Sequence, residues 1–163
     1  MDVLAALVGG ALKAHGLKLA TAESCTGGAV AHALTEIAGS SAWFERGFIT
    51  YSNESKRELL DVQQETLLQH GAVSEAVVRE MVTGALRHSH AQVALAVSGI
   101  AGPGGGTAEK PIGTVWFAWG IKNQVCVAQL HHLHGDRAEI RAHSVRIGLQ
   151  GVLDLLVQQT EIT

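Results

Sequence analysis

A serine, a tyrosine and a lysine lie in two polar segments that could together perform nucleophilic chemistry. Ser24 lies in residues 21–28, where hydroxyls and glycines separate an apolar alternating run from a run with helical spacing. Tyr51 and Lys56 lie in a second polar segment, residues 51–56. A serine activated by a lysine can hydrolyse an amide without a histidine. These residues predict a site in which Ser24 is the nucleophile, Lys56 the base and Tyr51 a proton relay or oxyanion donor.

Residues 21–28 also predict a place for an anion. A helix that directly follows a strand has backbone N–H groups without partners in its first turn, and these can hold an oxyanion. The residues that we expect to contact the substrate there are Cys25, Thr26, Gly27 and Gly28. Two alternatives stay open: Ser24 or Thr26 only caps the helix, or Cys25 is the nucleophile because thiolates form easily. We prefer Ser24, since a lone cysteine is more often a small buried hydrophobe.

The position of Lys56 predicts a lowered pKa. If Asn53 is the N-cap of the following helix, Lys56 is the third helical residue, where the helix macrodipole disfavours a positive charge. We therefore expect the pKa of Lys56 to lie below the ~10.4 of an unperturbed lysine, as a general base requires. Glu23 or Glu54 would oppose this shift if either lay close enough. The plainer alternative is a lysine that extends into solvent.

A third segment, residues 98–106, is too rich in glycine to be a simple connection. It is neither a P-loop nor a dinucleotide-binding fingerprint, because no helix follows it and no Gly-Lys-Ser/Thr appears. Its glycines would let the backbone approach a ligand and offer N–H groups to a phosphate, although a long surface turn is equally consistent. Arg137 could add a guanidinium for the same phosphate, unless it is an ordinary surface arginine. The residues predicted to bind substrate here are Ser98, Gly99, Gly102, Gly104, Gly105 and Arg137.

The nine histidines do not predict a metal centre. His131, His132 and His134 are close in sequence, but no cysteine or carboxylate completes a familiar ligand spacing. We expect neither a metal nor a cofactor.

Hydrophobic periodicity gives the elements that must position these segments. Helices are expected over residues 2–15, 27–37, 53–60, 64–69 and 74–88 and from 136 onward; strands over 17–21, 46–52, 93–97, 113–121 and 124–133. Strands that alternate with helices and then end in a hairpin predict an α/β fold, a three-layer α/β/α sandwich with a mixed, mostly parallel sheet. All three polar segments follow strand ends, where open α/β sheets bind ligands.

Composition limits the classes of protein to which the chain can belong. Its 163 residues, 47% of them hydrophobic, suit a single domain over residues 1–163. A net charge of −3 does not favour nucleic-acid binding, and no apolar run is long enough to span a membrane. The two cysteines are far apart, and the N-terminus lacks the basic start of a signal peptide, so we expect a cytoplasmic protein.

The large aromatic residues suggest a homodimer. Residues 113–121 are apolar on both faces and include Trp116 and Trp119, and Trp43 and Phe44 lie near a turn. Such residues often anchor interfaces. The alternative is that all of them belong to the core.

Long motifs distributed over nearly the whole chain resemble the CinA C-terminal domain family. They are T-A-E-S-C-T-G-G at 21–28, G-S-S-A-W-F-E-R-G-F-I-T-Y-S-N-E-S-K at 39–56, G-A-V-S-E at 71–75, S-G-I-A-G-P-G-G-G at 98–106, K-P-I-G-T-V-W at 110–116 and G-D-R at 135–137. Ser98 stands where threonine is common in the family, a change that keeps the hydroxyl.

Studied members of this family include nicotinamide-nucleotide amidohydrolases. The resemblance implies hydrolysis of the carboxamide of nicotinamide mononucleotide (NMN) to nicotinate mononucleotide and ammonia. It also implies that Ser24, Tyr51 and Lys56 form the catalytic group and that Arg137 and residues 98–106 help to bind the nucleotide. Because some members have no demonstrated deamidase activity, a non-catalytic nucleotide-binding or regulatory module is the alternative.

Overall fold

Five strands form one mixed sheet in the order β2-β1-β3-β4-β5. In a computed structural model, which describes residues 2–162 and the side chains of residues 2–158, the strands are β1 (Leu19–Glu23), β2 (Phe44–Ile49), β3 (Val93–Gly99), β4 (Thr114–Ile121) and β5 (Cys126–His132). Strand β1 pairs in parallel with β2 and β3, whereas β4 pairs antiparallel with β3 and β5. Four strands therefore share one direction and β4 opposes them.

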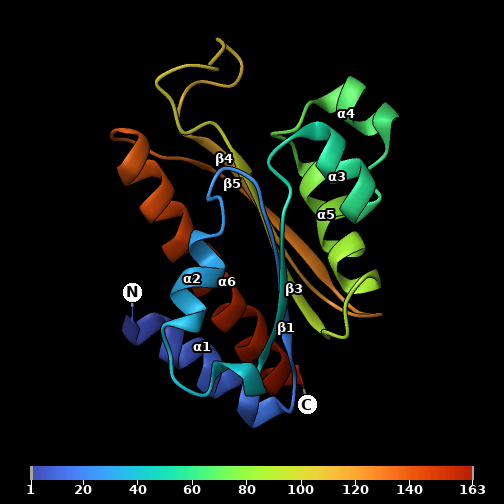
Figure 1. Ribbon diagram of the computed structural model, residues 1–163, viewed down its shortest axis with the longest axis vertical. Helices are drawn as coiled ribbons and strands as arrows, with labels where there is room; N and C mark the ends of the chain where they lie inside the picture. The colour runs from blue at the N-terminus through green and yellow to red at the C-terminus, as the bar shows by residue number, and fades with distance from the viewer. Residues whose placement is uncertain (1, 163) are drawn as a thin grey trace.

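Helices cover both faces of the sheet (Figure 1). The helices are α1 (Asp2–His15), α2 (Ala29–Thr35), α3 (Asn53–Leu60), α4 (Gln64–His70), α5 (Glu75–Arg87) and α6 (Arg137–Ile162), with a 3₁₀ turn η1 (Ser40–Ala42). Helices α1, α2 and α6 pack on one face, and α3 and α5 pack on the other, with α4 against α5. The predicted three-layer α/β/α sandwich with a mixed, mostly parallel sheet is confirmed.

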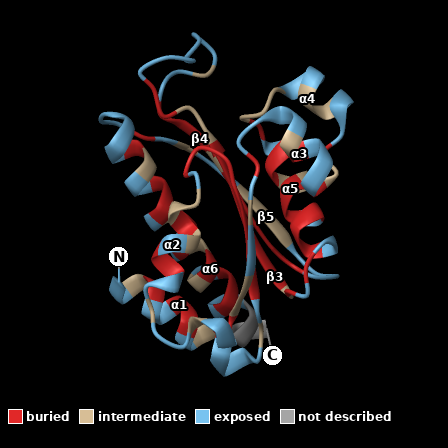
Figure 2. Cartoon of the chain, viewed as in Figure 1, coloured by how far each residue is buried: buried red, intermediate tan, exposed pale blue. Residues whose placement is uncertain are grey.

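The alternating side chains of β3 supply both halves of the core. Val93, Leu95 and Val97 face α1, α2 and α6, whereas Ala94 and Ala96 face α5. All five are fully buried, and Figure 2 shows the central strands in red between two helical layers. The small alanines let α5 lie close to the sheet.

The large aromatic residues are used mainly inside the chain. Trp43 and Trp119 are 5% and 2% exposed, and β4 is an internal strand with partners on both sides. Gly151 of α6 lies directly over the Trp119 indole, and a side chain at this position would collide with the ring. Trp43 and Trp119 thus belong to the monomer core, and Phe44 and Trp116 are partly buried against it. The homodimer itself stays a prediction.

One predicted helix start is wrong. Helix α3 is capped by Ser52, whose Oγ accepts from the Ser55 backbone N–H at 3.0 Å, while the Ser55 hydroxyl accepts from the Ser52 N–H at 3.2 Å. Asn53, the predicted cap, is therefore the first helical residue, and Lys56 is the fourth. The two residues have similar capping ability, and the reciprocal bond with Ser55 selects Ser52.

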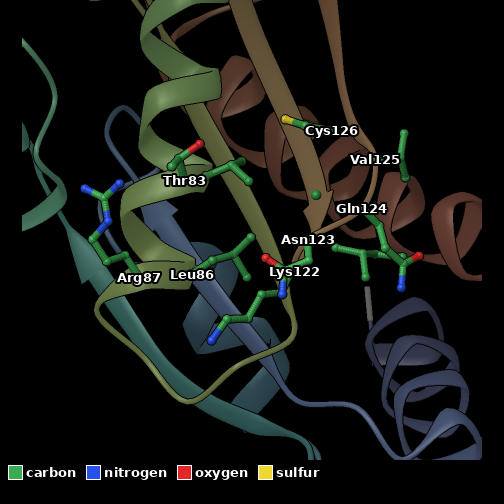
Figure 3. A pocket seen from close by; sticks show the side chains of 11 residues that line it. Thr83, Leu86, Arg87, Lys122, Asn123, Gln124, Val125 and Cys126 are labelled. Carbon is green, nitrogen blue, oxygen red and sulfur yellow. The ribbon is translucent and has the colours of Figure 1, made fainter.

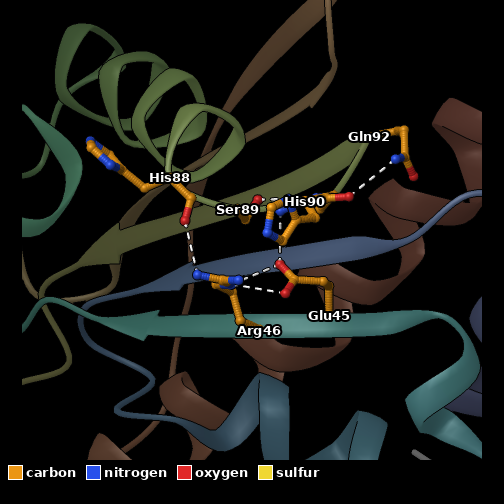
Figure 4. A network of polar contacts seen from close by, with 7 residues as sticks. Glu45, Arg46, His88, Ser89, His90 and Gln92 are labelled. Atoms are coloured by element: carbon orange, nitrogen blue, oxygen red, sulfur yellow. Dashed lines mark hydrogen bonds and ion pairs between the residues drawn. The ribbon is translucent and has the colours of Figure 1, made fainter.

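A polar network fastens the edge strand β2 at the end of the sheet where β3 begins (Figure 4). Glu45 bonds the Arg46 guanidinium at 2.8 Å and accepts from the His90 backbone N–H at 3.0 Å. Arg46 also donates to the His88 carbonyl at 3.2 Å. These contacts tie the outer strand to the segment between α5 and β3.

Among the described helices, none has the length and apolarity needed to cross a bilayer.

Candidate active site

The opposite end of the sheet gathers the three polar segments. Strands β1, β2 and β3 are parallel, so their carboxyl ends meet at one edge, and β5 delivers the start of α6 to the same edge. A cavity of about 240 Å³ opens there, lined by Ser24, Cys25, Tyr51, Asn53, Lys56, Ala72, Val73, Ser98, Gly99, Ala101 and Arg137. Seven of the predicted site residues thus line one cavity.

Ser24 and Lys56 form a direct pair in this cavity. The Lys56 Nζ lies 3.0 Å from the Ser24 Oγ and 2.8 Å from the Thr50 carbonyl oxygen. The exposed fractions are 8% for Ser24 and 1% for Lys56. A neutral amine in this position can donate to Thr50 and accept the serine proton, which is the geometry of a nucleophile with its base.

Burial lowers the pKa of Lys56 to about 8, because the ammonium loses its hydration inside the protein. The nearby Cys25 opposes this shift by its charge when it is ionised. The predicted direction of the pKa shift is confirmed, but its main cause is desolvation instead of a position in the first turn of α3.

Cys25 is poorly suited to be the nucleophile. It is 6% exposed, and burial raises the pKa of its thiol to about 11. The thiol is therefore protonated near neutral pH, and reactive cysteines have the opposite shift.

Tyr51 and Arg137 bond to each other at the cavity mouth. The Arg137 Nη2 donates to the Tyr51 hydroxyl at 2.9 Å, and its Nη1 donates to the Gly102 carbonyl at 2.8 Å. Within the described structure, the Tyr51 hydroxyl has no hydrogen bond to Ser24 or Lys56. The contact with Arg137 links the second and third polar segments, and the role of Tyr51 as a proton relay stays a prediction.

The glycine-rich segment contributes mainly its first residues. Ser98 and Gly99 line the cavity, and the Ser98 hydroxyl donates to the Ala72 carbonyl at 2.9 Å. Gly102 takes part through its carbonyl, whereas Gly104 and Gly105 are exposed and lie outside the cavity lining. The structure thus does not place these last two glycines at the predicted site.

The sequence profile of the CinA C-terminal domain matches residues 1–156. The chain belongs to this family. Among its relatives is the nicotinamide-nucleotide amidohydrolase PncC of Escherichia coli K12, which is 53% identical over 153 residues, or 94% of this chain and 93% of the relative. The Pseudomonas putida protein of the same name is 47% identical over 155 residues, or 95% and 96% of the two chains.

Solved structures of CinA-family proteins share the fold. The competence/damage inducible protein CihA of Agrobacterium tumefaciens superposes with a TM-score of 0.92 at 47% identity and covers 94% of each chain. A CinA superfamily protein of Klebsiella pneumoniae gives a TM-score of 0.92 at 44% identity over 96% of this chain and 98% of that protein.

The first turn of α2 in this CinA-family chain corrects one expectation. The Glu23 carboxylate, 1% exposed, accepts from the backbone N–H groups of Gly28, Val30 and Ala31 at 3.2, 2.9 and 3.0 Å. It also accepts from the Thr26 hydroxyl at 2.6 Å. The N–H groups expected to bind an anion at Gly28 and beyond are therefore already paired with a carboxylate of the protein itself.

Arg141 is a site-adjacent residue that the sequence analysis missed. Its Nε donates to the Cys25 carbonyl at 3.0 Å and its Nη2 to the Thr26 carbonyl at 3.2 Å. A signal was available, because Arg141 follows Arg137 by four residues and so shares its helical face. Asn53, Ala72 and Val73 also line the cavity without having been predicted as site residues.

A second cavity, about 410 Å³, is larger but has no comparable chemistry (Figure 3). It lies between α5 and the turn that joins β4 to β5, and Figure 3 shows Thr83, Leu86 and Lys122 around it. Arg87 at its edge is paired with Asp61 at 3.0 Å. In the described part of the chain, no three metal-binding side chains come together.

Proposed function

We propose that this chain hydrolyses the carboxamide of NMN to nicotinate mononucleotide and ammonia, through an acyl-enzyme on Ser24. The observation that carries the proposal is the hydrogen bond between the Ser24 Oγ and the buried Lys56 Nζ, together with the lowered pKa of that lysine. The names of relatives about half identical over almost their full length support the same substrate.

Neutral Lys56 takes the Ser24 proton as the Oγ attacks the carboxamide carbon. The resulting ammonium then protonates the amide nitrogen, the C–N bond breaks, and ammonia leaves an ester on Ser24. Water attacks this ester with Lys56 again as base, the bond between the acyl carbon and the Ser24 Oγ breaks, and Lys56 returns the proton to Oγ as nicotinate mononucleotide is released. The Thr50 carbonyl, 2.8 Å from Nζ, holds the amine in place through these steps.

The tetrahedral intermediate needs donors for its oxyanion. The Gly27 N–H donates to the Ser24 carbonyl at 3.0 Å, and the Gly28 N–H donates to Glu23. Within the described structure, no other residue accepts a hydrogen bond from the N–H groups of Cys25 and Thr26. These two amides are therefore our candidates for the oxyanion hole.

The cavity would hold the reacting end of the nucleotide. At about 240 Å³ it lies below the roughly 300–1,000 Å³ that is usual for small-molecule sites, so the ribose phosphate would extend past the mouth. Arg137 stands there, and a guanidinium with five N–H donors keeps some for a phosphate after bonding Tyr51 and Gly102.

Ammonia release from NMN by the purified protein tests the proposal. We expect turnover by the wild type and almost none by Ser24→Ala, which should still bind NMN in calorimetry. Binding of NMN by the wild type without ammonia release would favour the alternative, a non-catalytic nucleotide-binding module.

We also propose that the protein forms a homodimer and that it resides in the cytoplasm. Static light scattering at micromolar concentration tests the first, and a monomer mass would refute it.

A further inference from the structure

The turn that carries Ser24 is held by two oppositely charged side chains. On one side the Glu23 carboxylate accepts hydrogen bonds from the N–H groups at the start of α2 and from the Thr26 hydroxyl. On the other side Arg141 of α6 donates hydrogen bonds to the Cys25 and Thr26 carbonyls. A Cβ built on Gly27 would lie 3.4 Å from the Arg141 Nη2, so the guanidinium passes directly over this turn.

The bond from Arg141 to the Cys25 carbonyl fixes the orientation of the Cys25–Thr26 peptide group. The Cys25 carbonyl and the Thr26 N–H belong to the same planar peptide and point in opposite directions. Because the carbonyl is bonded to Arg141, the Thr26 N–H points away from α6. A carbonyl that accepts a charge-assisted hydrogen bond also polarises its amide and makes the N–H a stronger donor.

We propose that Arg141 is a positioning residue for the reaction, which fixes and polarises the Cys25–Thr26 peptide so that its N–H stabilises the oxyanion formed at Ser24. This inference rests on the proposed function. Arg141 acts through the backbone that it bonds, because it does not line the cavity, whereas Arg137, one turn earlier, does. The two arginines of one helical face thus have different tasks: Arg137 faces the substrate and Arg141 holds the catalytic turn.

A split between kcat and KM tests this division. Losing one oxyanion donor outright costs about 100- to 1,000-fold in kcat, so misplacing one should cost about 10- to 100-fold. We expect this loss in Arg141→Ala, with KM for NMN within about twofold of wild type, because the bond acts in the transition state. Methylguanidinium in the assay should restore part of kcat. Arg146→Ala, an exposed arginine on the same helix, is the matched control and should be normal.

Any other result for these variants would overturn the inference. An unchanged kcat in Arg141→Ala, or a raised KM with normal kcat, overturns the inference. If Arg141→Ala fails to fold, Arg141→Lys keeps the charge but loses the two-pronged geometry. We expect kcat of this variant to fall about tenfold by the same reasoning, and a normal kcat overturns the inference. Ser24→Ala is measured in parallel: if it stays active, the proposed function itself fails, whereas loss in Ser24→Ala with a normal Arg141→Ala removes only the role of Arg141.

Discussion

The side chains of Ser24 and Lys56 meet at 3.0 Å although 32 residues separate them. The parallel pairing of β1 with β2 brings them together, since the ladder continues beyond Ile49 with a bond from the Thr50 N–H to the Glu23 carbonyl at 2.9 Å. Ser24 follows Glu23 directly, and the Thr50 carbonyl holds the Lys56 amine. The register of two strands therefore sets the distance between nucleophile and base.

The pH dependence of turnover should report the ionisation of Lys56. The lysine acts as a base only when neutral, and burial lowers its pKa to about 8. We expect kcat/KM for NMN to rise with pH through a single ionisation near that value and then to level off. Lys56→Arg should be almost inactive because a guanidinium does not release its proton in this range. Lys13→Arg, an exposed lysine of α1, serves as control, and normal turnover in Lys56→Arg would show that position 56 supplies charge and not basicity.

Cys25 should be dispensable for chemistry. Its raised pKa, about 11, leaves a protonated thiol at pH 8, and Arg141 bonds its carbonyl and not its sulfur. Cys25→Ala should keep substantial kcat, whereas Ser24→Ala loses nearly all turnover. Steady-state kinetics of both variants decide the matter, and the reverse pattern would identify the cysteine as nucleophile.

Recognition should depend on the phosphate of the substrate. Two cationic side chains, Lys56 and Arg137, line the cavity. Arg137 is the one at the mouth, where the ribose phosphate would extend. We expect a much higher kcat/KM for NMN than for nicotinamide riboside, and a raised KM in Arg137→Ala. Tyr51→Phe refines this test: a higher KM would mean that the hydroxyl orients Arg137, and a lower kcat would support a proton relay. Similar kcat/KM for the nucleotide and the riboside would contradict phosphate recognition.

The fold and the three polar segments could be predicted because they depend on local patterns. Apolar alternation marks strands, and parallel strands bring their carboxyl ends to one edge. The start of α3 could not be predicted, since Ser52 and Asn53 are both good caps and only a hydrogen bond to Ser55 distinguishes them. The lowered pKa of Lys56 was predicted mainly from its place in the first turn of the helix. Its main cause is burial, which depends on the tertiary structure.

The roles of Glu23 and Arg141 depend on contacts that the sequence does not reveal. Arg141 lies 116 residues from Cys25 along the chain. Glu23 has a weaker local signal, since carboxylates favour helix starts, but a strand residue that reaches the helix behind it is visible only in three dimensions.

Glu23→Gln should destabilise the protein. The carboxylate accepts four hydrogen bonds, and an amide would present an NH₂ group to some of the same donors. Leaving a buried donor without an acceptor costs about 1–3 kcal/mol, so we expect the free energy of unfolding to fall by that amount. Urea denaturation measures it, with Glu54→Gln, an exposed glutamate of α3, as control. Equal stability of the two variants would argue against the role given to Glu23.

The buried lysine should make stability depend on pH in a defined direction. The pKa of Lys56 is about 8 in the folded protein and 10.5 as the reference value. Between these values the unfolded chain binds a proton that the folded protein does not, so the free energy of unfolding rises with pH. Below pH 8 the folded protein bears the full cost of a buried ammonium. Lys56→Met has no such group, and the ionisations that are not coupled to Lys56 cancel when wild type and variant are compared.

We therefore expect the unfolding free energy of the wild type, minus that of Lys56→Met, to increase by about 3 kcal/mol from pH 7 to pH 10.5. The absolute difference at one pH is less informative, because the variant also loses the bonds to Ser24 and Thr50. Chemical denaturation across this range, with Lys13→Met as the exposed control, gives the slope. A difference that does not change with pH would mean that the lysine keeps an ordinary pKa in the folded protein. The neutral base assigned to Ser24 would then exist in only about one molecule in several thousand at pH 7, instead of about one in ten.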